Sequence, residues 1–386
     1  MNLSTISQKF SVNYSYELFF TRGLFETSNP LFVDLIKDYQ ADKQVKIIFV
    51  LDDAIVKLNS TLLTSIEGYC STYKEQIDIR EVIVIKGGEQ SKNQSANVER
   101  IWNGINEKNI CRHSFVVVIG GGALIDMVGY AAATAHRGVK LIRVPTTVLA
   151  QNDAGVGVKN GINAFGKKNF IGTFALPYAI INDFDFLKTL EQRDWISGIA
   201  EAIKVALIKD ETFFYFIEDN ATRLATRDMN AMGPLIHRCA EIHMQHISQG
   251  GDPFESGSSR PLDFGHWAAH KLEQLTNYKL RHGEAVAMGI ALDITYAHLI
   301  GLIDEQTLNR ILKVFDNIGF DLVMPIDTNT TTDLLQGIEE FREHLGGELT
   351  ITLISKIGKK LDVHQVEEDK MRRAIALRSS KEQITL

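Results

Sequence analysis

The sequence has few of the features that mark secreted, membrane or nucleic-acid-binding proteins. Its 386 residues include only three cysteines, Cys70, Cys111 and Cys239, which are scattered and in no CxxC spacing, so we expect reduced thiols and a cytoplasmic protein. No apolar run approaches the roughly 18–20 residues that span a bilayer, and the N-terminus lacks the apolar stretch of a signal peptide. The 41 basic and 48 acidic residues form no long basic block and give a net charge of −7, which argues against membranes and nucleic acids as partners.

What the sequence does contain is two different hydrophobic patterns. In the first half, short β-branched runs alternate with amphipathic segments, the pattern of a parallel sheet covered by helices. The predicted strands span 45–53, 81–88, 114–122, 140–147 and 178–184. Later, apolar residues recur every three or four positions, and only 349–358 resembles a strand. We therefore predict an α/β N-terminal nucleotide-binding domain, residues 1–187, and an all-α C-terminal domain, residues 188–386, with the site between them.

A glycine-rich turn is the strongest local indication of nucleotide binding. A buried strand leads into Gly120, Gly121 and Gly122 and then directly into a helix that carries Asp126 near its first turn. Glycines allow the backbone to approach a pyrophosphate, which the N-terminus of a helix attracts. The run does not match G-x-G-x-x-G, so a plain strand-to-helix turn remains the alternative. Other polar residues follow neighbouring strands and raise the odds of a shared site: Asp52, Glu89 and Lys92.

The segment 144–172 is too long to be a simple connection and is dense in polar side chains. It contains Asp153, Lys159, Lys168 and Asn169, and two lysines with an amide suit a phosphate monoester. Apolar side chains are expected to anchor this loop, namely Ile162, Phe165, Phe170 and Ile171. We therefore predict an ordered polar loop rather than a flexible surface loop.

Candidate metal ligands come from distant parts of the chain. Glu201 and Lys204 share a helix face at i, i+3, His266 and His270 share another at i, i+4, and His282 precedes Gly-Glu. One Glu and two His make the ligand set of a catalytic zinc site with an open fourth position. Buried histidines are more often satisfied core residues, and a second spaced set competes for the role, consisting of His237, His243 and His246.

Five motifs carry a family resemblance, and they occur in order and at similar spacings: GGGALIDMVGYAAATAHRG, VPTTVLAQNDAGVGVKNGIN, KTLEQRDWISGIAEAIKVALI, DFGHWAAHKLE and RHGEAVAMGIA. Over roughly residues 45–300 the chain resembles 3-dehydroquinate synthases and, more broadly, the sugar-phosphate cyclase superfamily. The resemblance implies an NAD- and zinc-dependent (or cobalt-dependent) homodimeric enzyme. Such an enzyme cyclises a seven-carbon ketose phosphate and eliminates phosphate, with NAD reduced and reoxidised in the cycle.

The resemblance also implies roles for individual residues. The metal ligands would be Glu201, His266 and His282. NAD would be lined by Asp52, Glu89, Lys92, Gly121, Gly122, Ala123, Asp126, Thr146, Thr147, Asp153, Lys159 and Lys168. The catalytic residues around the substrate would be Asp153, Lys159, Lys204, Asp263 and His270. Lys159, Asn169 and His270 would hold the phosphate, and Arg137 would reach in from the partner subunit.

Departures from the dehydroquinate synthase pattern bear on the substrate. Those enzymes read R-x-x-L-N-F-G-H before the first metal-binding histidine, but this chain has Asp263 in place of the Asn and Arg260 one position closer to the histidine. His243 stands where a carboxylate-binding lysine is expected, and Arg342 remains as a phosphate contact near the C-terminus. Together with Pro261, these residues resemble the 2-epi-5-epi-valiolone synthase branch, which uses sedoheptulose 7-phosphate.

Three other functions stay open at this stage. The first alternative is a 3-dehydroquinate synthase, which turnover of the carboxylated substrate would reveal. The second is an NAD- and metal-dependent polyol dehydrogenase, which would accumulate NADH. The third is a non-catalytic descendant, which the complete set of metal ligands disfavours.

Overall fold

The computed structural model describes residues 5–254, 261–327 and 330–379. The first half of the chain forms β1 (Glu17–Thr21), α1 (Leu31–Tyr39), β2 (Val45–Asp52), α2 (Asp53–Leu58), α3 (Leu62–Thr72), β3 (Ile77–Ile85), η1 (Glu89–Asn93), α4 (Ser95–Glu107), β4 (Phe115–Gly120), α5 (Gly122–Thr134), η2 (Ala135–Arg137), β5 (Lys140–Pro145), η3 (Ala150–Ala154), β6 (Lys159–Ala164), β7 (Lys167–Phe174), β8 (Ala179–Asp183) and η4 (Phe184–Thr189). The second half forms α6 (Gln192–Ser197), α7 (Ile199–Lys209), α8 (Glu211–Asp219), α9 (Ala221–Ala225), α10 (Met229–Gln249), η5 (Pro261–Asp263), α11 (His266–Leu275), α12 (His282–Leu299), α13 (Glu305–Ile318), α14 (Thr331–His344), β9 (Ile351–Lys356), β10 (Lys359–Val363) and α15 (Glu368–Ser379).

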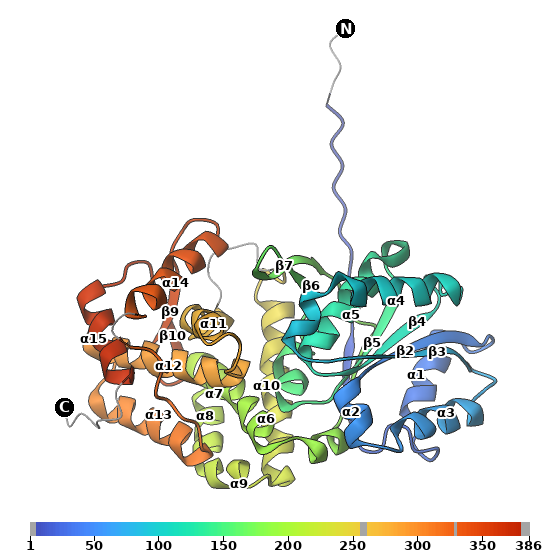
Figure 1. Cartoon of the computed structure of the whole chain (residues 1–386), viewed down its shortest axis with the longest axis horizontal. Coiled ribbons are helices and arrows are strands. Elements are labelled where there is room, and N and C mark those ends of the chain that lie inside the picture. The colour runs from blue at the N-terminus through green and yellow to red at the C-terminus, as the bar shows by residue number, and fades with distance from the viewer. Residues whose placement is uncertain (1–4, 255–260, 328–329, 380–386) are drawn as a thin grey trace.

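A six-stranded parallel sheet, in the order β1-β8-β5-β4-β2-β3, forms the centre of the first half. Alternate residues of each strand face opposite sides, so Val117 packs under α1 and α3 while Val116 and Val118 pack under α4 and α5. The five predicted strands are confirmed, although β3 begins at Ile77 rather than residue 81. The edge strand β1 was not predicted. Figure 1 shows the sheet with its covering helices on the right and the helical half on the left.

A β hairpin replaces the loop expected in segment 144–172. Strands β6 and β7 are joined by the two-residue turn Phe165-Gly166, in which both residues have positive φ, at 53° and 72°. The anchoring role predicted for its apolar residues is wrong for three of the four. Phe165 is 84% exposed and contacts Phe170 on the outer surface, and Ile171 is also exposed. Only Ile162 packs against the core beneath α5.

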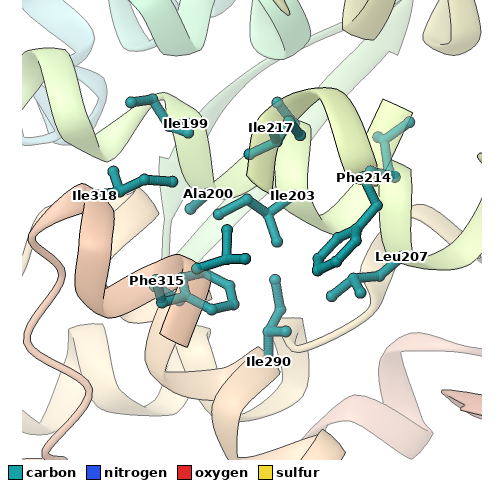
Figure 2. Packing of buried hydrophobic residues seen from close by; sticks show 14 of the residues in the cluster. Ile199, Ala200, Ile203, Leu207, Phe214, Ile217, Ile290, Phe315 and Ile318 are labelled. Carbon is teal, nitrogen blue, oxygen red and sulfur yellow. The ribbon is translucent and has the colours of Figure 1, made fainter. Parts of the chain in front are cut away.

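The second half is helical, as predicted, except for one hairpin. Helix α7 lies at its centre with Ala200, Ile203 and Leu207 packed against α8, α12 and α13, which Figure 2 shows at close range. The strand-like run 349–358 contains β9 and pairs with β10, which corrects the all-α prediction. The hairpin forms because Gly358 takes a positive φ of 79° at the turn and Leu353 is fully buried in the core. None of the described helices has the length and apolar character needed to cross a bilayer.

Candidate active site

The carboxyl ends of three neighbouring strands meet at one edge of the sheet. Asp52 ends β2, and its carboxylate accepts a hydrogen bond of 2.9 Å from the Ala54 N–H at the start of α2. A Cβ on Gly87, after β3, would lie 1.9 Å from Asp52 Oδ2, and one on Gly120, at the end of β4, would lie 3.2 Å from Asp52 Cβ. Burial raises the pKa of Asp52, although the Ala54 N–H partly offsets it. The edge is therefore closely packed around one carboxylate.

The glycine-rich turn leads from β4 into α5, as predicted. Gly121 is the N-cap of α5, and the helix begins at Gly122, so Ala123 lies in its first turn. A Cβ on Gly122 would lie 2.8 Å from Ala154 Cβ, closer than side chains tolerate, which requires glycine there. Thr147, just after β5, lies beside Gly121, next to the buried Thr146. This arrangement leaves the N-terminus of a helix at the sheet edge, where a phosphate group is favoured.

Lys92 and Asp126 are brought together beside that turn. Lys92 Nζ donates a hydrogen bond of 2.9 Å to Asp126 Oδ2, and its side chain is only 1% exposed. Glu89 Oε1 lies 3.7 Å from the same ammonium group. Asn169, on β7, also contacts Lys92 Nζ through its side-chain oxygen. The hairpin thus closes over the predicted nucleotide residues, and Asn169 lies against Lys92.

Glu201, His266 and His282 converge in the helical half. Their potential ligand atoms lie within 4.8 Å of one another. Glu201 Oε1 is 3.7 Å from His266 Nε2 and 3.4 Å from His282 Nε2, and it is buried without a hydrogen bond. A buried carboxylate oxygen that faces two imidazole nitrogens fits a divalent metal such as zinc, because these are the preferred atoms of such a site. These are the three residues that the family resemblance implies as metal ligands.

Close backbone contacts bring these residues together. His266 and His282 are the first residues of α11 and α12, and Glu201 lies on α7. A Cβ on Gly289 of α12 would lie 2.0 Å from Gly265 O, and one on Gly283 would lie 1.8 Å from Ser197 O. The first contact packs α12 closely against the residue before α11, and the second packs it against the end of α6. Three separate parts of the chain can therefore present ligand atoms to one point.

The ionisable groups around this point shift one another's pKa values. Burial acts to raise the pKa of Glu201, but Lys204 and His282 outweigh it and hold that pKa at about 2. Burial acts to lower the pKa of His282, but Glu273 and Glu201 raise it to about 9. His266 behaves differently, because burial and the nearby Lys204 keep its pKa well below 6.5. An ionised carboxylate, a neutral imidazole and an imidazole between two carboxylates thus surround the site.

Glu273 was not identified in the sequence, yet it lies directly behind the site. Its Oε2 is 3.4 Å from His282 Nδ1, and its Oε1 accepts a 3.2 Å hydrogen bond from Lys168 Nζ of β7. It thereby joins the hairpin of the first half to the second half of the chain. The signal was present, since His266, His270 and Glu273 occupy positions i, i+4 and i+7 of one helix face.

The substrate-side residues gather around Lys204, which is buried and paired with Glu201. Burial acts to lower the pKa of Lys204, but Glu201, Asp153 and Asp263 together raise it. Asp153 lies in η3, a single π-helical turn, and its Oδ1 is 3.0 Å from His243 Nδ1. Four residues predicted to surround the substrate are therefore adjacent.

The other predicted residues take varied places. The competing histidine set is dispersed: His237 packs on Phe20 and His246 contacts Lys209, so neither joins a potential metal-binding group among the described residues.

Arg137 precedes β5 and thus lies at the opposite edge of its own sheet. Arg342 pairs with Glu339 on α14. Lys159 begins β6, the His270 ring lies 5.5 Å from that of His266, and Arg260 lies outside the described residues.

Comparison with known families identifies the class. Residues 82–197 match the model of the 3-dehydroquinate synthase N-terminal domain, and residues 198–340 match that of the 3-dehydroquinate synthase C-terminal domain. The chain belongs to the 3-dehydroquinate synthase family and is a sugar-phosphate cyclase of that family. The resemblance drawn from the five motifs is thereby confirmed.

Individual relatives include two kinds of cyclase. The chain is 36% identical over 310 residues to a 3-dehydroquinate synthase from Alkaliphilus metalliredigens, covering 80% of this chain and 83% of the relative. It is 33% identical over 295 residues to a 2-epi-valiolone synthase from Actinosynnema mirum, covering 75% and 76%. The structure of 2-epi-5-epi-valiolone synthase from Streptomyces hygroscopicus, which holds NAD+ and Zn2+, superposes with a TM-score of 0.86 at 26% identity and covers 97% of this chain and 99% of that one.

Proposed function

We propose that this protein binds NAD and one zinc ion, with cobalt as a substitute, and cyclises sedoheptulose 7-phosphate to a valiolone-type cyclitol with elimination of phosphate. Glu201, His266 and His282 would hold the metal. NAD would lie along the carboxyl edge of the sheet, over the Gly121-Gly122 turn. The proposal draws support from the convergent ligand atoms, the glycine turn and the likeness to a synthase with both groups bound.

When bound, NAD would accept and return a hydride, and zinc would polarise substrate oxygens. The residues of the chain would bind and orient one flexible substrate, which is a large part of the task in such chemistry. Lys204 would donate hydrogen bonds to a substrate oxygen, since its pKa is raised by the three carboxylates around it, against the effect of burial, and it stays protonated. Lys159, Asn169 and His270 would hold the phosphate, and Arg137 of one protomer would complete the site of the other in a homodimer.

The carboxylates around Lys204 are the reason for proposing sedoheptulose 7-phosphate as the substrate. Asp153 and Asp263 both act on this lysine, together with Glu201, so three carboxylates lie near its ammonium group. Carboxylates accept hydrogen bonds from hydroxyl groups and repel a second carboxylate. His243, in the position of an expected lysine, lies beside Asp153. A hydroxylated heptulose phosphate would therefore suit these carboxylates better than the carboxylated substrate of dehydroquinate synthases would.

A 3-dehydroquinate synthase is the second candidate, and one observation favours it. The relative from Alkaliphilus metalliredigens shares 36% of residues with the chain, a little more than the valiolone-type relative shares. Both activities occur on this fold, so a sequence identity at this level does not determine the substrate. The residues around Lys204 must determine it instead.

The deciding experiment is phosphate release by the metal-loaded protein with NAD. Sedoheptulose 7-phosphate and 3-deoxy-arabino-heptulosonate 7-phosphate are compared side by side, with product masses and NADH absorbance recorded. We expect release from the first substrate only, without net NADH. Release from the second would establish a dehydroquinate synthase, and NADH accumulating with a simple polyol would indicate a dehydrogenase.

Asp263 provides a sharper test of the same proposal. Asp263→Asn removes the negative charge while keeping the shape, and it restores the residue typical of dehydroquinate synthases. We expect about a tenfold or larger loss of kcat/KM for sedoheptulose 7-phosphate, in line with a lost hydrogen bond to a charged group. Unchanged turnover of that substrate would remove the main argument for the valiolone branch. Asp316→Asn, on α13, is the matched control.

A further inference from the structure

A buried carboxylate that the proposed chemistry does not use lies behind His266. Asp293 is in the middle of α12 and is 0% exposed. Its Oδ2 accepts a hydrogen bond of 3.0 Å from the Gly265 N–H, and its Oδ1 accepts one of 2.9 Å from Trp267 Nε1. The two donors are the residues immediately before and after His266. One side chain thus holds the first turn of α11 from both sides of a metal ligand.

The peptide between Phe264 and Gly265 connects this carboxylate to the imidazole ring. Its N–H donates to Asp293, and its carbonyl oxygen lies 3.1 Å from His266 Nδ1. A carbonyl oxygen can only accept, so Nδ1 carries the proton and Nε2 presents its lone pair. That lone pair faces Glu201 Oε1 at 3.7 Å. The chain of contacts runs from carboxylate through one peptide group to the ring that would bind metal.

We propose that Asp293 is a positioning residue for the metal ligand His266 and acts through the Phe264–Gly265 peptide. This inference rests on the metal site of the proposed function. Ligand histidines commonly donate their second N–H to a carboxylate or a backbone carbonyl, which fixes the tautomer and makes the ligand more basic. Here a carboxyl group stands behind the carbonyl, and aligned hydrogen bonds polarise one another, so the ionised form of Asp293 would make the ring more basic.

His282, the other proposed histidine ligand, has a similar arrangement in which the carboxylate contacts the ring directly. His282 Nδ1 faces the Glu273 carboxylate without an intervening peptide. Gly265 has a φ of +78° and a Cβ there would lie 2.7 Å from Ile290 N, so α12 packs directly against the backbone that precedes His266. A carboxylate in this apolar part of α12 is costly unless its oxygens are satisfied, and both of them are.

The test measures zinc affinity of the purified chain by competition with a chelator. Asp293→Asn removes the charge and can accept only one of the two N–H groups, so we expect zinc binding to weaken about 10- to 100-fold. Trp267→Phe removes only the second contact and should weaken it less. Thr295→Val, a buried change on the same helix, should lower the melting temperature without altering zinc affinity.

The outcomes separate this inference from the proposed function. Zinc affinity within twofold of the wild type in Asp293→Asn would overturn the positioning role. Failure of the wild type to bind zinc would instead overturn the proposed metal site. If Asp293→Asn does not fold, 15N chemical shifts of His266 in the wild type decide: the Nδ1–H tautomer is expected, and the Nε2–H tautomer would refute the relay.

Discussion

The two halves of the site are built in different ways. The nucleotide edge consists mostly of backbone: glycines at Gly87, Gly120 and Gly122 pack so closely that no side chain fits, and a helix N-terminus faces the opening. The proposed metal group consists of side chains on buried helices, and each of its two histidines is held by a further polar contact behind it. We therefore expect substitutions in the first half to weaken binding through steric clashes. We expect substitutions in the second half to weaken binding through altered charge or orientation of the side chains. Substitutions that affect one half alone would test this division.

The largest effect is expected at the metal group. His266→Ala removes one of three ligands, so we expect loss of activity and bound zinc well below one per chain, as measured by atomic absorption. His237→Ala is the matched control, because His237 packs on Phe20 away from the site. Survival of zinc content and turnover in His266→Ala would disprove the assignment of the metal site.

The corresponding change at the nucleotide edge is Gly122→Val. A Cβ at this position would lie only 2.8 Å from Ala154 Cβ, so the added atoms would collide with Ala154 and displace the start of α5. We expect NAD binding to weaken at least about tenfold in calorimetry, with zinc content unchanged, since shape complementarity at the phosphates is lost. Gly68→Val, on α3, has open space around it and serves as the control. Equal loss of zinc and NAD would show that the halves are not independent.

Glu273 joins the two halves and should give an intermediate effect. Glu273→Gln removes the charge that faces His282 Nδ1 and Lys168 Nζ, so we expect about tenfold weaker zinc binding. Lys271, on the same helix as Glu273, forms an ion pair with the exposed Glu340. Glu340→Gln weakens this pair and should leave zinc affinity unchanged. If both variants behave alike, the position behind His282 has no special role.

The last comparison concerns stability and pH. Burial raises the pKa of Asp293 from 3.8 to about 7, and the N–H groups of Trp267 and Gly265 offset it only in part. A raised pKa means that the folded state binds this proton more tightly than the unfolded state does. The stability that proton binding contributes to the fold is therefore full below the ordinary pKa of 3.8 and is lost as pH rises toward about 7. The stability of the wild type relative to Asp293→Asn should fall by about 1.4 kcal/mol per pH unit from pH 5 to 7.

Urea unfolding of both proteins across this range, at fixed ionic strength, measures that difference. Parallel pH profiles for the wild type and Asp293→Asn would mean that the carboxyl group does not titrate in the folded protein over this interval.

Much of the site was predictable because its signals are local. Residues 47–51 and 115–119 are continuous apolar runs, and the Gly120–Gly122 turn follows directly from the second. The hairpin β6–β7 was missed because its strands are rich in Gly, Asn and Lys, which have low strand propensity, although Phe165-Gly166 is a suitable turn. Asp293 was also missed, although a single acid within the apolar run 285–297 is the kind of signal that marks a buried polar contact.

Most of the elements, the order of the two halves and the residue types proposed to bind phosphate and metal follow from the amino-acid order alone. Periodicity and glycine turns act over a few residues, so they can be read without the fold. Which histidines meet Glu201 depends instead on packing between distant segments, because backbone contacts at Gly283 and Gly289 bring residues 201, 266 and 282 to one point. The same packing selects the partners behind them, Glu273 and Asp293, since a carboxylate acquires its role from what it faces in the folded chain.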